Sequence, residues 1–129
     1  MKRNSAMKQN SAVKHRARLF AGIVLAASAA AAQAHSHLVR AVPANGSVVA
    51  AAPARVVLDF SEAARLTAAW IERDGGPKQK LESLPIEASA RLTVQLPALA
   101  PGRYELSWRA SSADGHIVPG HIRFTVSPS

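Results

Sequence analysis

The sequence has 129 residues, no cysteine, and 16 Lys and Arg against eight Asp and Glu, for a formal net charge of +8. This length allows one domain, and the lack of cysteine excludes disulfides from whatever stabilises it. Six of the basic residues precede position 35 and the other ten are scattered, so the chain lacks the concentrated basic face that nucleic-acid-binding proteins need.

Residues 1–34 have the three parts of a secretory signal peptide. A basic start is followed by the apolar run LFAGIVLAASAAAA and by the small-residue sequence Ala32-Gln33-Ala34. The apolar run has about 14 residues, fewer than the about 20 that a membrane-spanning helix needs. We therefore expect cleavage after Ala34, export to the periplasm, and a mature domain of residues 35–129 that begins with His35 and carries a net charge of only +2.

The mature part alternates between apolar and polar residues over short segments that are separated by Pro, Gly, Asn and Asp, as is typical of β-strands and turns. The predicted strand segments are 39–42, 54–62, 67–73, 91–96, 102–111 and 121–126. The predicted inward residues include Val56, Leu58, Phe60, Tyr104, Leu106, Trp108, Ile122, Phe124 and Val126. Residues 61–69 could also form a turn of helix, and residues 77–90 look like a looser connection. The pattern predicts an all-β fold of about seven strands, a sandwich or a small barrel.

Catalytic motifs are lacking in the mature part, but its histidines are grouped. No G-x-S-x-G surrounds Ser61, and no Gly-rich phosphate loop is present. His35 and His37 lie at the new N-terminus, whereas His116 and His121 lie near the C-terminal end. In the sequence Asp114-Gly115-His116, the aspartate and the histidine are two positions apart. On an extended backbone such residues point the same way, so the carboxylate and the imidazole can reach one point. The alternative is an ordinary exposed turn.

An N-terminal histidine favours a metal site. The free amine and imidazole of His35 can close one chelate ring, to which His116 would add a third nitrogen and Asp114 an oxygen. Three nitrogens and one oxygen in a roughly square arrangement suit Cu(II), whereas Zn(II) prefers a tetrahedron. A rival arrangement uses the amine, two backbone amides and the imidazole of His37. It needs amides that strand pairing would occupy, so His37 is expected near the metal and, at most, as a secondary ligand.

Two long segments resemble the CopC family of periplasmic copper-resistance proteins, which includes YobA-like members. The segment HSHLVRAVPANGSVVAAAPARVVLDFSE is similar to the family's mature start, which has a first histidine, a P-A-x-G/S turn and the pattern P-x-x-(V/I)-x-L-x-F-S-E. The segment GRYELSWRASSADGHIVPGHIRFTV is similar to its last hairpin, with D-x-H at the turn. The resemblance implies an immunoglobulin-like Greek-key β-sandwich that binds Cu(II) through His35, Asp114 and His116.

The resemblance also implies a carrier or buffer of copper without enzymatic activity, with a separate membrane copper transporter of the CopD type as partner. Some members hold Cu(I) on methionines, but the only methionines here are Met1 and Met7, so a thioether site is excluded from the mature chain. Two other classes remain open. A histidine-first copper site also occurs in oxygen-activating monooxygenases, and an exported sandwich can be a plain interaction module.

Overall fold

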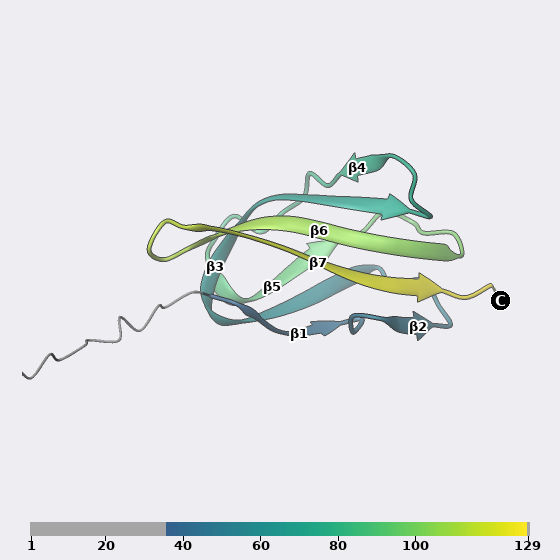
Figure 1. Ribbon diagram of the computed structural model, residues 1–129, viewed down its shortest axis with the longest axis horizontal. Coiled ribbons are helices and arrows are strands. Elements are labelled where there is room, and N and C mark those ends of the chain that lie inside the picture. Colours follow the sequence, from purple (N-terminus) through teal and green to yellow (C-terminus); the bar gives the residue numbers. More distant parts are fainter. Residues whose placement is uncertain (1–35, 129) are drawn as a thin grey trace, which may run out of the picture. The chain divides into compact units, whose positions relative to one another are not determined.

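The computed structural model describes residues 36–128, which form an all-β fold of seven strands (Figure 1). The strands are β1 (Leu38–Val42), β2 (Ser47–Val49), β3 (Arg55–Arg73), β4 (Lys78–Lys80), β5 (Ser89–Gln95), β6 (Gly102–Ser112) and β7 (Ile117–Val126). No helix that could cross a membrane occurs in this part of the chain. The all-β class and the strand number predicted from the alternation are confirmed.

The 19-residue strand β3 belongs to both layers of the sandwich. Its first part pairs with β1 on one side and with β5 on the other, in antiparallel register. Its second part pairs with β4 and β6, and the same layer continues through β7 to β2, which runs parallel to β7. Figure 1 shows β3 curving from one layer to the other at the end of the molecule where the β6–β7 hairpin turns.

The core lies between the layers and is made by alternate residues of the long strands. Of the residues predicted to share inward faces, the nine named above are buried, as are Leu92 and Val94, whereas Leu96 is only partly buried. Phe124 on β7 stacks on Tyr104 of β6 with ring centroids 5.6 Å apart, and Trp108 meets Phe60 edge-on at 6.3 Å. Trp108 also faces Gly120, where a Cβ would lie 2.5 Å from the indole, so only glycine fits opposite this ring. Bulky apolar residues on facing strands thus supply the packing that a disulfide-free domain of this size requires.

Residues 61–69 form no helical turn and instead continue β3. Ala64 and Leu66 are buried, but the next buried pair is Ala69 and Ile71, because the register with β6 shifts between Leu66 and Ala68. A bulge of this kind moves the inward face from even to odd positions and so breaks the period of two on which strand prediction depends. The loose connection predicted at 77–90 contains the short strand β4 and the first two residues of β5, and is otherwise irregular.

Candidate metal centre

The turn of the β6–β7 hairpin holds Asp114 and His116. It spans the residues between Ser112 and Ile117, the last residue of β6 and the first of β7. The backbone N–H of Gly115 donates to the carbonyl oxygen of Ser112 at 2.9 Å, and the N–H of Ser112 donates to the carbonyl oxygen of His116 at 3.0 Å. Gly115 has a φ of 85°, a left-handed conformation that other residues adopt with difficulty. The turn is therefore defined by its backbone hydrogen bonds and by one glycine.

Asp114 accepts hydrogen bonds on both carboxylate oxygens. The hydroxyl of Ser112 donates to Oδ1, and the backbone N–H of His116 donates to the same oxygen at 3.1 Å. Oδ2 lies 2.7 Å from Nδ1 of the His116 imidazole. The Ser112 hydroxyl, followed by the side chain and backbone N–H of His116, holds the pKa of the Asp114 carboxyl well below its usual range. The carboxylate is thus ionised at every pH at which an imidazole can be neutral.

The spacing of this pair suits a metal ion. In the square arrangement that suits Cu(II), neighbouring ligands lie at right angles, so donor atoms at bonds of about 2.0 Å are about 2.8 Å apart. The 2.7 Å between Oδ2 of Asp114 and Nδ1 of His116 is close to this separation. Both side chains are substantially exposed, at 40% and 69%. Both groups are therefore accessible to a metal ion from solvent, and metal binding requires the imidazole nitrogen that binds to be deprotonated.

Ser36 and His37 are fixed to β3 at its passage between the layers. The hydroxyl of buried Ser36 donates to the carbonyl oxygen of Glu62 at 2.8 Å. The backbone N–H of His37 donates to the hydroxyl of Ser61 at 3.0 Å, and the N–H of Ser61 donates to the carbonyl oxygen of His37 at 2.8 Å. The His37 amide that the rival arrangement requires is therefore already engaged, although by a side chain and not by a strand ladder.

The same end of the molecule contains the N-terminal segment and the hairpin turn. Ala64 of β3, two residues beyond Glu62, pairs with Ser112 at the base of the hairpin. Within residues 36–128, no three His, Asp or Glu side chains form a group that could hold a metal. The predicted third ligand residue, His35, lies outside the described residues.

The roles of two side chains of this region, Ser112 and Ser61, escaped the sequence reasoning. Ser112, which buttresses Asp114, was missed, although a serine two residues before an aspartate at a hairpin turn is a detectable signal. Ser61, considered only as a nucleophile, has the hydroxyl 3.1 Å from Nδ1 of His37. His121, grouped with His116 by sequence, is exposed on β7 and lies on the outer face of the sheet, not in the hairpin turn.

Comparisons with known proteins agree with this architecture. The CopC domain model matches residues 38–127. Copper resistance protein C of Pseudomonas syringae pv. tomato is 35% identical over 107 residues, covering 75% of this chain and 84% of that protein. Copper transport protein CutJ of Bacillus subtilis (strain 168) is 31% identical over 98 residues, which cover 72% of this chain but 18% of CutJ. The crystal structure of CopC from Methylosinus trichosporium OB3b superposes with a TM-score of 0.64 and 34% identity, covering 73% of this chain and 95% of that one.

Proposed function

Because the chain belongs to the CopC family, we propose that it is a periplasmic Cu(II)-binding protein that carries or buffers copper in copper homeostasis and resistance. The observation that carries the proposal is the ionised Asp114 carboxylate held 2.7 Å from the His116 imidazole at an exposed hairpin turn. The name of the Pseudomonas relative, a copper resistance protein, supports copper as the metal. Periplasmic location follows from the predicted signal peptide.

The proposed ligands are the amine and imidazole of His35, the carboxylate of Asp114 and the imidazole of His116. Three nitrogens and one oxygen favour Cu(II), which stands at the top of the divalent affinity order for such donors. The tethering of Ser36 and His37 to β3 supports this set over the N-terminal tripeptide mode, because the His37 amide would have to leave the Ser61 hydroxyl and lose its proton.

A carrier suits this donor set better than a catalyst does. Oxygen activation needs an open coordination position on the metal, and a bound Asp114 carboxylate would occupy one. No methionine follows Met7, so the mature chain offers no thioether for Cu(I). In CutJ the matching region is 18% of a longer copper transport protein, which supports a separate membrane transporter of the CopD type as partner of the present chain.

The N-terminus provides the most direct test. We expect one alanine added before His35 to weaken Cu(II) binding at least about a hundredfold, because the amine of His35 would become an amide. Even loss of a residue that only hydrogen-bonds to a metal ligand lowers metal affinity about 10- to 100-fold. The intact mass of the exported protein establishes its first residue, and competition with a chelator measures affinity. An alanine added after Ser129 is the control. Equal affinity of the two extended proteins would contradict the ligand set.

Replacing Ser112 with alanine should weaken Cu(II) binding by about 10- to 100-fold, as is typical when a ligand loses its outer hydrogen-bond partner. The Ser112 hydroxyl is the main cause of the lowered pKa of Asp114, so its loss raises that pKa and frees the carboxylate to rotate. The same chelator competition measures the effect. Ser111→Ala, which removes the neighbouring hydroxyl on the other face of β6, should retain the original affinity, and a similar loss in both variants would contradict the positioning role.

Proton competition should occur in the imidazole range. The pKa of Asp114 is lowered, so the carboxylate stays ionised as pH falls and is lost as a ligand only below the usual range for Asp. Imidazole and amine nitrogens bind metal only when deprotonated, and an unperturbed imidazole titrates near about 6.5. We therefore expect affinity to fall as pH falls through about 6 to 7. A decline that begins only near about pH 4 would instead identify carboxylates as the titrating ligands.

A further inference from the structure

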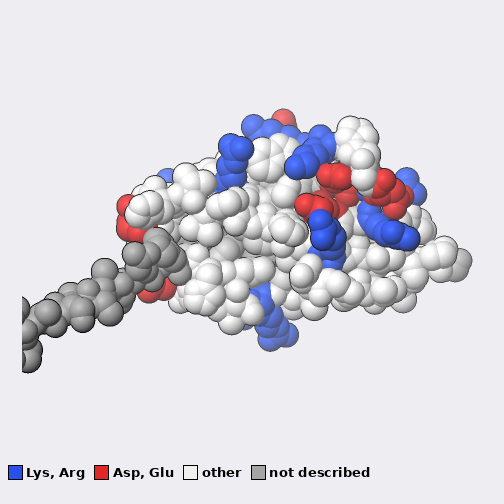
Figure 2. Space-filling model, in the orientation of Figure 1, with Lys and Arg blue, Asp and Glu red and all other residues white. Residues whose placement is uncertain are grey.

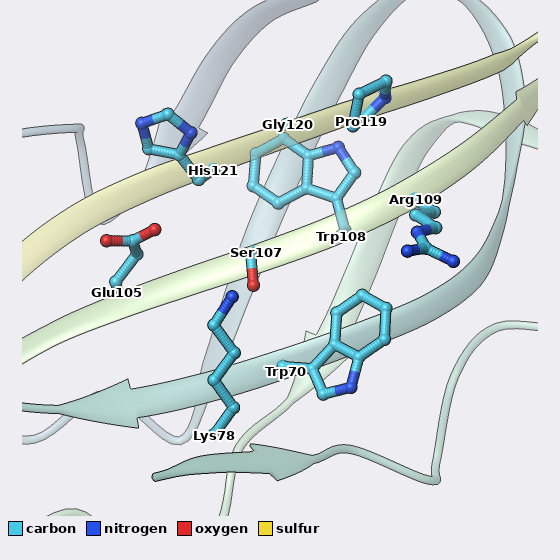
Figure 3. A pocket seen from close by; sticks show the side chains of 9 residues that line it. All are labelled: Trp70, Lys78, Glu105, Ser107, Trp108, Arg109, Pro119, Gly120 and His121. Atoms are coloured by element: carbon cyan, nitrogen blue, oxygen red, sulfur yellow. The ribbon is translucent and has the colours of Figure 1, made fainter. Parts of the chain in front are cut away.

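The outer face of the layer formed by β4, β3, β6 and β7 carries a hollow that the copper proposal does not use (Figure 3). Its volume is about 540 Å³, and its lining includes Trp70, Lys78, Ser107, Arg109 and His121. Trp70 pairs across the strands with Ser107, which in turn pairs with His121. Ser107 and Arg109 alternate along β6 with buried Leu106, Trp108 and Ala110, so a sheet with a packed core supports the hollow.

A tryptophan and an arginine dominate this surface. Trp70 is half-buried on the solvent side of β3, and the guanidinium carbon of Arg109 lies 5.4 Å from the centroid of its ring. Trp108 of the neighbouring strand, by contrast, is buried as predicted. Stacking on Trp70 orders the guanidinium, and its N–H groups remain available to a ligand because Arg109 is exposed.

The hollow has an excess of positive charge. Its acidic residue, Glu105, is paired with Arg123 at 3.1 Å, which offsets its charge. Within residues 36–128, neither Lys78 nor Arg109 has a carboxylate within 4.0 Å. Figure 2 shows several Lys and Arg side chains over the upper strands of this side of the molecule, with acidic side chains grouped to their right. Figure 3 shows Lys78 extending toward Ser107 from one side of Trp70, with Arg109 on the other side.

We propose that this surface, defined by Trp70, Lys78 and Arg109, docks an acidic segment of a partner protein. Carboxylates of such a segment would complement the charges of Lys78 and Arg109, and the guanidinium of Arg109 can donate two parallel hydrogen bonds to one carboxylate. Trp and Arg are the residues that most often dominate the binding energy of protein interfaces, and here they lie side by side. The surface lies on a sheet face and not in the hairpin turn of Asp114 and His116, so docking can occur while the metal is bound.

The test uses the purified copper-free protein and a short poly-glutamate peptide as probe, so its outcome is independent of copper binding. We expect NMR shift changes at the Trp70 indole N–H, the Arg109 side chain and the backbone around Ser107 and His121. Arg109→Gln should weaken binding by about fivefold or more, as expected for the loss of a contact worth about 1 kcal/mol. Trp70→Leu should also weaken it, with the thermal unfolding midpoint recorded for each variant to show that it is folded.

The matched control is Arg55→Gln, which removes the same charge from an exposed residue of β3 in the other layer. It should change affinity by less than about twofold, since distant exposed charges are screened by salt. If Arg109→Gln and Arg55→Gln lose equal peptide affinity, the peptide binds by general charge attraction and the proposal is overturned. An absence of shift changes at Trp70 would have the same consequence. Binding of free benzoate as tight as that of the peptide would also overturn it, in favour of a small-molecule site.

Discussion

Replacing His116 with alanine is expected to weaken Cu(II) binding about a thousandfold, more than the about 10- to 100-fold typical of a partner outside the coordination sphere. The variant removes one proposed nitrogen ligand and leaves Asp114 without the imidazole that lies 2.7 Å from its Oδ2. The turn itself should persist, because its hydrogen bonds use the backbone of His116 and not its ring. Chelator competition at neutral pH, with circular dichroism to verify the fold, measures the effect.

His121→Ala is the matched control for this prediction, because it removes an exposed imidazole five residues further along the chain. It should leave Cu(II) affinity within about twofold of the original. A small change is expected when neither a metal ligand nor a residue that hydrogen-bonds to one is removed. If His116→Ala binds Cu(II) as tightly as His121→Ala does, the metal is held by the N-terminal tripeptide alone. In that case His37→Ala becomes the variant that abolishes tight binding, and the folded site is disproved.

Replacing Phe124 with alanine is expected to lower the free energy of unfolding by about 3–5 kcal/mol, the usual effect of truncating a buried aromatic residue. Phe124 is 2% exposed and stacks on Tyr104, so its removal leaves a cavity between the layers and an unpaired ring. Urea denaturation of the copper-free protein measures the change and keeps metal binding out of the comparison.

Two controls bracket this loss of stability. Phe124→Leu keeps most of the buried apolar surface and should be clearly less destabilising than alanine. Ile86→Ala truncates a side chain that is 84% exposed and should change the free energy of unfolding by at most about 0.5 kcal/mol. If Phe124→Ala proves no more destabilising than Ile86→Ala, the packing between β6 and β7 described above is incorrect.

The fold was predictable where the alternation is uninterrupted and not where the register shifts. Along β6 and β7 every predicted inward residue is buried, because each strand keeps one phase against its neighbour. In β3 the phase changes between Leu66 and Ala68, and the residues around the change are small and weakly patterned, so helix and strand could not be separated. The choice of where a strand bulges depends on its partner, and a single sequence does not contain the pairing.

For the candidate site, the sequence predicted that Asp114 and His116 converge, but for an incomplete reason. Asp114 and His116 do lie together, but the alternation of an extended strand does not bring them there. They sit in a turn in which Gly115 is left-handed and Ser112 closes the hairpin. The role of the Ser112 hydroxyl depends on that turn geometry, as the stacking of Arg109 on Trp70 depends on strand pairing. Residue types and spacing can therefore indicate candidate ligands. The residues that hold those ligands in place can be identified only once the backbone conformation is known.

The membership of β3 in both layers has a consequence for how metal occupancy affects the whole molecule. Neither layer can detach without breaking the strand that they share, so opening at one end disrupts hydrogen bonds in both sheets. Unfolding should then be all-or-none, and an ion bound only by the native state should raise the melting temperature of every strand together, in proportion to the logarithm of its free concentration. Calorimetry at several copper concentrations would accordingly show a single transition that moves without splitting.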